Sequence, residues 1–272
     1  MLGIMQGRLV APMEGRIQAF PRDHWADEFP NAAAAGLGAI EWIYDTYGLG
    51  ANPIESAPGI ERIRQLSRTH RIAVRSICAD YFMDFTFVRA TGAERAERIT
   101  HLHGLLEVAQ QLGVTRMVLP FVDSSEIRDE ADRDAVVDML QKALPAAAAA
   151  GVELHLETSL DPDAFAQLLE RIPHPLVKVN YDSGNSSSLG YRPADEFAAY
   201  GRRVGSVHIK DRLLHGTTVP LGQGDADLNE VFRCLRSLNY AGDYVLQVAR
   251  GAEGSEVSWA SRNRAYVERY LN

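Results

Sequence analysis

Eight short apolar runs recur along the chain, and this repetition most limits the folds that it can adopt. The runs lie near residues 2 to 5, 39 to 43, 73 to 78, 116 to 121, 152 to 157, 176 to 182, 204 to 209 and 244 to 248. The segments between them have helical periodicity, and strands that alternate with helices build parallel sheets. Eight strands and about eight helices in 272 residues match a closed (β/α)₈ barrel.

The ends of the expected helices carry the residues that helix ends prefer. Thr91 and Glu94 have the spacing of a capping box, so we expect a helix from there to about Leu112. Asp161-Pro162 and Arg192-Pro193 each place a proline where a helix begins. These boundaries fit helices that alternate with the apolar runs.

The alternative architecture is an open, doubly wound parallel sheet. Such a sheet typically carries a glycine fingerprint after its first strand. The segment from Gly3 to Arg8 is not such a fingerprint. We therefore predict one α/β domain over residues 1–272, a single (β/α)₈ TIM barrel.

Composition limits the partners that the chain can have. Its formal net charge of −8 argues against nucleic acid, because proteins that bind polyanions normally carry a basic face. The two cysteines, Cys78 and Cys234, support neither a disulfide framework nor a thiolate metal site. Neither a signal peptide nor a membrane-spanning run is evident. We expect a soluble cytoplasmic protein without nucleic acid or membrane partners, in which apolar positions on outer helices could support a homo-oligomer.

Three of the apolar runs end in side chains that can bind a metal ion. Glu157, Asp182 and His208 close the fifth, sixth and seventh runs, and alternation along each strand points all three into the barrel. The carboxyl ends of barrel strands meet at one mouth, where such folds carry out their chemistry. Two carboxylates with one imidazole suit Mn²⁺, Mg²⁺, Co²⁺ or Zn²⁺. His155 also points inward, either to support this site or as a hydrogen-bonded interior histidine without a catalytic purpose.

The chain resembles the xylose isomerase-like TIM barrel superfamily, in particular its sugar phosphate isomerase/epimerase branch, which is related to ketose 3-epimerases. The resemblance covers nearly the whole length and rests on Ile40-Glu41-Trp42, Leu156-Glu157, Asp182-Ser183-Gly184-Asn185, Val207-His208-Ile209-Lys210-Asp211 and Pro220-Leu221-Gly222-Gln223-Gly224-Asp225. It implies one divalent metal ion held from strands five to eight by Glu157, Asp182, His208 and Gln247.

Gln247 departs from that pattern, because the relatives have glutamate there. An amide oxygen can still coordinate a hard cation, but it cannot accept a proton as a carboxylate does. The resemblance implies two glutamates that handle protons on opposite faces of the substrate, and this chain keeps one, Glu157. The candidates for a second acid are Asp211, Asp80, Lys210 or water.

The expected activity is a metal-dependent isomerase or epimerase of a small sugar, sugar phosphate or related polyhydroxy carbonyl compound. A metal-stabilised enediolate would form when Glu157 removes a proton, and a single base favours aldose–ketose isomerisation over two-base epimerisation. Two alternatives stay open: a metal-dependent polyol-ketone dehydratase, and a sugar- or metal-binding barrel that lost turnover through Gln247. The DNA-repair branch is disfavoured by the acidic charge and by the absence of histidine after the third and fourth runs.

Several polar residues near the expected mouth are candidates for substrate binding. Arg8, Lys210 and Arg250 follow the first, seventh and eighth runs, which are neighbours in a closed barrel. Barrels often bind phosphate beside the seventh and eighth strands, so these cations favour a phosphorylated or carboxylated sugar. Glu41 and Asn185 are expected to bind substrate hydroxyls, and Glu41 could instead pair with a nearby arginine.

Overall fold

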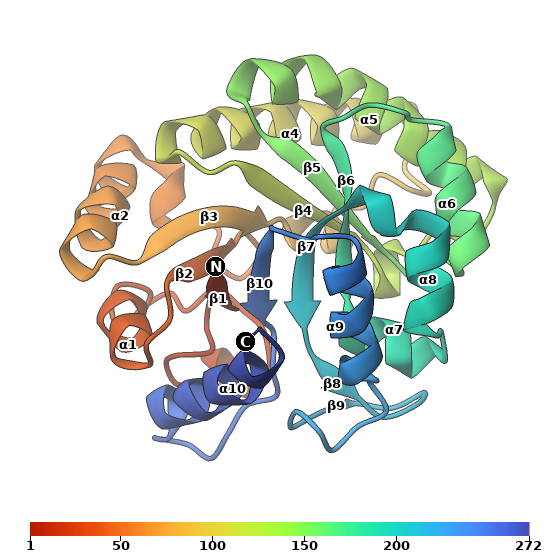
Figure 1. Cartoon of the computed structure of the whole chain (residues 1–272). Coiled ribbons are helices and arrows are strands. Elements are labelled where there is room, and N and C mark those ends of the chain that lie inside the picture. Colours follow the sequence, from red (N-terminus) through yellow and green to blue (C-terminus); the bar gives the residue numbers. More distant parts are fainter. Residues whose placement is uncertain (272) are drawn as a thin grey trace.

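The computed structural model describes residues 1–271. Eight parallel strands close into a barrel in the order β1-β10-β7-β6-β5-β4-β3-β2. The strands are β1 (Leu2–Met5), β2 (Ala39–Ile43), β3 (Ala73–Cys78), β4 (Arg116–Phe121), β5 (Glu153–Thr158), β6 (Val177–Asp182), β7 (Val204–Ile209) and β10 (Asp243–Leu246). Figure 1 shows these strands at the centre with helices around them. The predicted (β/α)₈ barrel is confirmed, and each strand lies within a few residues of its apolar run.

Helices cover the outside of the barrel. They are α1 (Glu28–Ala34), α2 (Ala57–His70), α3 (Tyr81–Asp84), α4 (Gly92–Leu112), α5 (Glu130–Ala150), α6 (Pro162–Glu170), α7 (Ser183–Leu189), α8 (Pro193–Tyr200), α9 (Leu228–Ser237) and α10 (Glu256–Leu271). The short α3 and α7 are additions to the predicted pattern, and each directly follows a strand at the mouth. A two-stranded ribbon, β8 (Asp211–Arg212) with β9 (Thr218–Val219), extends from β7. Within residues 1–271, no helix has the length and apolar character that a membrane span requires.

The predicted helix boundaries are confirmed by their capping contacts. Thr91 and Glu94 form the reciprocal capping box of α4, which ends at Leu112. The side chain of Asp161 accepts a hydrogen bond from Ala164 N at the start of α6. Helix α8 also begins with its proline, although Arg192 makes no side-chain capping bond there. Local sequence chemistry therefore fixes where these helices begin.

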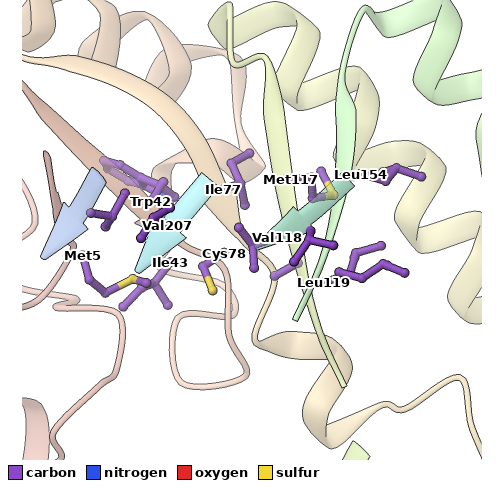
Figure 2. Packing of buried hydrophobic residues seen from close by; sticks show 14 of the residues in the cluster. Met5, Trp42, Ile43, Ile77, Cys78, Met117, Val118, Leu119, Leu154 and Val207 are labelled. Carbon is purple, nitrogen blue, oxygen red and sulfur yellow. The ribbon is translucent and has the colours of Figure 1, made fainter. Parts of the chain in front are cut away.

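The apolar core lies between the strands and the surrounding helices. Trp42 of β2 is fully buried and packs against the rings of Phe20, Trp25 and Phe29, with centroid distances of 5.9, 5.9 and 6.3 Å. Figure 2 shows part of this core around Trp42, Ile77 and Met117. Trp42 thus belongs to the core on the helix side of β2, and the neighbouring Glu41 points the other way, into the barrel.

The barrel interior, in contrast, is polar near the mouth. Two register shifts, one at Ile40/Glu41 in the β2–β3 pair and one at Val179/Asn180 in the β6–β7 pair, precede inward-facing polar residues. Such irregularities commonly re-aim side chains beside functional sites. The interior therefore carries hydrogen-bonding groups where an ordinary barrel packs branched apolar side chains.

Candidate metal centre and barrel mouth

Glu157, Asp182 and His208 meet inside the barrel at its C-terminal end. Each offers one potential ligand atom, and the three atoms lie within 4.8 Å of one another. His208 Nδ1 lies 3.3 Å from Glu157 Oε2 and 3.9 Å from Asp182 Oδ2. All three residues are buried. The structure thus brings together the three residues that the strand ends predicted.

Asp182 is held in place by the helix that follows it. It is the N-cap of α7, and its Oδ1 accepts hydrogen bonds from Gly184 N and Asn185 N, both at 2.9 Å. Oδ2 is left to face His208 and Lys210. A Cβ at position 184 would lie 2.5 Å from Lys210 Cγ, so glycine is needed there. The Asp-Ser-Gly-Asn segment is therefore a capped turn that aims one carboxylate oxygen inward.

The two ring nitrogens of His208 have different surroundings. Nε2 lies 2.6 Å from Glu41 Oε1, and because a carboxylate only accepts, Nε2 carries a proton. Nδ1 is buried and makes no hydrogen bond with any of the described residues. Burial alone would lower the pKa of His208, but the carboxylates of Glu41 and Glu157 raise this pKa to about 10. The pocket around Nδ1 therefore favours positive charge.

Glu157 is oriented by two asparagine side chains. Its Oε1 accepts from Asn185 Nδ2 at 2.6 Å, and its Oε2 accepts from Asn180 Nδ2 at 2.7 Å. Both donors are neutral amides, so they fix the carboxylate without neutralising it. Asn185 was predicted to bind substrate. In this structure its side-chain amide nitrogen donates a hydrogen bond to Glu157. Asn180, the second donor, comes from β6.

A chain of buried side chains continues from Asn180 down the barrel. Ser206 Oγ donates to Asn180 Oδ1 at 2.6 Å and lies 2.7 Å from His155 Nδ1. His155 Nε2 lies 2.9 Å from Glu153 Oε2. A Cβ at Gly205 would come within 2.6 Å of the His155 ring, so this glycine makes room for the imidazole. His155 is therefore connected to Glu157 through two intervening side chains.

Gln247 lies just beyond the end of β10. Its backbone N–H bonds to Ile209 O at 3.0 Å, and Val245 of β10 is the register partner of His208. Side chains alternate along a strand, so Gln247 points inward like Val245 and His208, one step closer to the mouth. Its Nε2 donates to Gln18 Oε1 at 3.0 Å, whereas its Oε1 is buried and has no hydrogen-bond partner within residues 1–271.

A cavity of about 560 Å³ opens at this mouth. Its wall includes Glu157, Asn185, Lys210 and Gln247, together with Gln18 from the loop after β1. Cavities of this size accept small metabolites. Glu157 and Gln247 therefore border a space that is large enough for a sugar.

Comparison with known proteins places this architecture in a family. The family model described as xylose isomerase-like TIM barrel matches residues 29–266. The chain belongs to this family. The match includes Glu157, Asp182, His208 and Gln247.

Named relatives of the xylose isomerase-like TIM barrel family include sugar epimerases. The chain is 24% identical over 238 residues to L-ribulose-5-phosphate 3-epimerase UlaE of Shigella flexneri, covering 82% of each chain. It resembles the structure of D-psicose 3-epimerase with D-tagatose from Clostridium cellulolyticum H10, with a TM-score of 0.77, 15% identity and coverage of 100% and 99%. The IOLI protein with a bound zinc atom gives a TM-score of 0.78 at 18% identity, with coverage of 99% and 98%.

The cations predicted to bind substrate are already engaged with the protein. Arg8 Nε donates to Val248 O at 2.9 Å, and Arg250 donates to Gly7 O at 2.6 Å and to Val10 O at 3.0 Å. These two arginines connect the loop after β1 with the loop after β10. Their predicted role in substrate binding stays a prediction, and in this structure they shape the mouth.

Lys210 and Glu41 also contact the metal-binding candidates directly. Lys210 Nζ lies 2.8 Å from Asp182 Oδ2 and 3.3 Å from Asn185 Oδ1. Glu41 faces His208 and makes no salt bridge with Arg8 among the described residues. Both were predicted to touch substrate, and the structure places both beside candidate ligands.

The candidates for a second acid lie in different settings. Asp211 is fully buried and accepts backbone hydrogen bonds from Gly222, Gly224 and Ala226 at 2.8, 3.0 and 3.0 Å. It therefore organises the glycine-rich loop. Asp80 lines the cavity and accepts from Gln18 Nε2 at 2.6 Å. Gln18 was missed by sequence reasoning, because nothing in its loop predicts that it reaches the mouth.

Proposed function

We propose that the chain is an isomerase or epimerase of a small sugar or sugar phosphate, and that it uses one divalent metal ion. The observation that carries this proposal is the buried group of Glu157, Asp182 and His208 at the mouth of the barrel. Support comes from the family and from relatives named as ketose and ketose-phosphate 3-epimerases.

The donor set fits a divalent cation. In the described part of the chain, neither His208 Nδ1 nor Gln247 Oε1 has a hydrogen-bond partner, although both atoms are buried. His208 Nδ1 also faces two carboxylate oxygens. Buried polar atoms without a partner are rare and cost free energy, so a cation would satisfy both. Glu157, Asp182, His208 and Gln247 would hold it. Three oxygens and one nitrogen without a thiolate suit Mn²⁺, Mg²⁺, Co²⁺ or Zn²⁺, and a bound cation supplies polarisation of a substrate carbonyl and its neighbouring hydroxyl.

Glu157 is the proposed base. Asn180 and Asn185 fix its carboxylate, and Glu157 borders the cavity where a substrate carbon would lie. Positioning of this kind matters because proton transfer requires hydrogen-bond reach. Glu157 would take the proton from the hydroxyl-bearing carbon next to the carbonyl and return it to the former carbonyl carbon on the same face, while the hydroxyl proton moves to the former carbonyl oxygen.

The opposite face has no matching carboxylate at position 247, because a glutamine amide does not accept a proton at neutral pH. Asp211 is committed to three backbone amides. Asp80 and Lys210 remain as cavity-lining groups that could serve there. The one-base transfer through Glu157, which corresponds to aldose–ketose isomerisation, is therefore the step that the chain's own residues best support.

Exchange of carbon-bound hydrogen tests the proposal. The protein is incubated with Mn²⁺ in deuterated water together with L-ribulose, L-ribulose 5-phosphate or D-psicose, and deuterium incorporation is followed by NMR. We expect incorporation next to the carbonyl, loss of incorporation with a chelator, and a strong loss in Glu157→Gln. Absence of exchange across these sugars while Mn²⁺ is shown to bind would refute the catalytic proposal and favour a binding protein.

A further inference from the structure

The amide of Gln247 has two unlike ends, and only one of them can bind a cation. Its oxygen carries lone pairs, whereas its NH₂ group is a donor. In the structure Nε2 donates to Gln18 Oε1 at 3.0 Å, which turns Oε1 away from Gln18. Gln18 therefore decides which end of Gln247 remains available inside the mouth.

The orientation of Gln18 is in turn set by two groups of fixed polarity. Its Nε2 donates to Asp80 Oδ2 at 2.6 Å, and an ionised carboxylate can only accept. Its Oε1 accepts from Arg8 Nη2 at 3.2 Å, and a guanidinium can only donate. Reversing Gln18 would place oxygen against oxygen at Asp80 and donor against donor at Arg8.

Both ends of this chain of side chains are themselves anchored. Asp80 Oδ1 accepts from Cys78 Sγ at 3.0 Å, and Arg8 Nε donates to Val248 O at 2.9 Å. Asp80 and Gln18 come from the loops after β3 and β1, and Gln247 follows β10. Three separate parts of the barrel thus combine to orient one amide.

We propose that Gln18 and Asp80 are positioning residues that keep the oxygen of Gln247 facing the divalent cation, and so allow a glutamine to serve as its fourth ligand. This inference rests on the proposed function, because it takes the cation to lie at Glu157, Asp182 and His208. It also explains the otherwise unbonded Oε1 of Gln247.

A carboxylate introduced by Gln247→Glu would have a different hydrogen-bonding requirement from the amide, because it has no donor. It needs a donor from Gln18, but the single NH₂ group of Gln18 is already bonded to Asp80. Gln18 presents its oxygen to position 247, so the new carboxylate would face that oxygen unless Gln18 reversed. Asp80→Asn removes one of the two contacts that oppose this reversal, because an asparagine can donate to the Gln18 oxygen. Only the longer contact with Arg8, at 3.2 Å, then opposes turning the Gln18 NH₂ group to the new carboxylate.

Mn²⁺ titration calorimetry of four proteins tests this: wild type, Asp80→Asn, Gln247→Glu and the double variant. We expect Asp80→Asn to weaken Mn²⁺ binding in the wild-type background and to strengthen it in the Gln247→Glu background. The coupling between the positions should be about tenfold, within the range found for side chains in one network. Simple loss of negative charge would weaken binding in both backgrounds, so a change of sign identifies the orienting role.

Two further variants complete the test. Gln18→Leu removes the orienting amide and should weaken Mn²⁺ binding by about tenfold or more, as for other supporting partners of metal ligands. Asp84→Asn removes a carboxylate that lines the same cavity but accepts from Thr46 at 2.6 Å, so it should act equally in both Gln247 backgrounds. Melting temperatures report whether each variant folds.

The outcomes separate the orienting role from the metal-dependent function. If wild type binds Mn²⁺ and Gln18→Leu binds it equally well, or if Asp80→Asn acts in the same direction in both backgrounds, the orienting role is overturned. If folded wild type binds no Mn²⁺, the proposed metal-dependent function itself fails.

Discussion

Replacing Glu28 by glutamine should stabilise the protein at alkaline pH and have a smaller effect at acidic pH. Glu28 begins α1, is fully buried, and accepts a hydrogen bond from Leu9 N at 3.1 Å through Oε1. Its Oε2 is buried and accepts no hydrogen bond from the residues that the structure describes. Burial raises the pKa of Glu28 to about 7, against the backbone amides of Gly7 and Leu9, which lower it.

The size and sign of the effect follow from that pKa. The difference between about 7 in the fold and the ordinary value of 4.5 corresponds to about 3 kcal/mol. Because the folded-state pKa is raised, the protonated carboxyl is favoured in the fold. Its stabilisation is full below pH 4.5 and is lost as pH rises through about 7. Glu28→Gln keeps the shape and stays neutral, so it avoids this loss.

The measurement compares melting temperatures of wild type and Glu28→Gln at about pH 5 and about pH 8. The advantage of the variant should grow by about 2 to 3 kcal/mol between these values, which is roughly 5 to 10 °C for a chain of this size. Comparing two proteins at each pH cancels the titration of other groups. Glu107→Gln, at an exposed position of α4, is the matched control. An advantage for Glu28→Gln that is the same at both pH values would refute the reasoning.

Further predictions concern the candidate site. Glu157→Gln should reduce turnover by about 10²- to 10⁴-fold, the range for losing a general base; steady-state kinetics that change less than tenfold would assign the proton transfer elsewhere. Glu41→Gln should weaken Mn²⁺ binding by about 10- to 100-fold, because it removes the carboxylate that orients His208; calorimetry showing unchanged affinity would contradict that role. Ser206→Ala should cost about 1 to 3 kcal/mol in unfolding free energy, because it removes the hydroxyl that bonds to His155 Nδ1 and Asn180 Oδ1; a neutral effect in denaturant titration would contradict this cost. Mn²⁺ at about 100 times its dissociation constant should add about 2.7 kcal/mol of stability, and an unchanged melting temperature would contradict binding to the folded state.

Much of the fold could be predicted from the sequence because its signals are local. Each apolar run marks a strand, and the capping residues Thr91 and Asp161 mark helix starts with their own hydrogen bonds. Strand parity placed Glu157, Asp182 and His208 inside, and parallel strands bring their carboxyl ends to one mouth. The grouping of these three residues therefore required no knowledge of the loops.

The contacts of the site residues could not be predicted in this way. Gln18 is 229 residues from Gln247 in the sequence, and it reaches the mouth only because β1 and β10 are neighbours in the closed barrel. Arg8 and Arg250 follow strands at the mouth, as phosphate-binding groups often do, yet the same position lets them bond to backbone carbonyls of adjacent loops. The charge of an arginine and its place after a strand do not show whether it binds phosphate or a backbone carbonyl, because that depends on where the loop carbonyls lie.

Gln247 shows why the ligands of a metal ion should be considered together with the residues that hydrogen-bond to them. An amide is a weaker and less specific ligand than a carboxylate, because one of its ends is a donor. In this chain Asp80 accepts from Gln18 and Arg8 donates to it, and these two bonds fix the orientation of the Gln18 amide. Gln18 in turn accepts from Gln247 Nε2, which leaves the Gln247 oxygen facing inward. Changing residue 247 alone therefore conflicts with its neighbours, and a change that restores a carboxylate should require compensation at Asp80. Relatives with glutamate at the corresponding position would need a different partner for it, so the identity of the ligand and that of its supports should vary together.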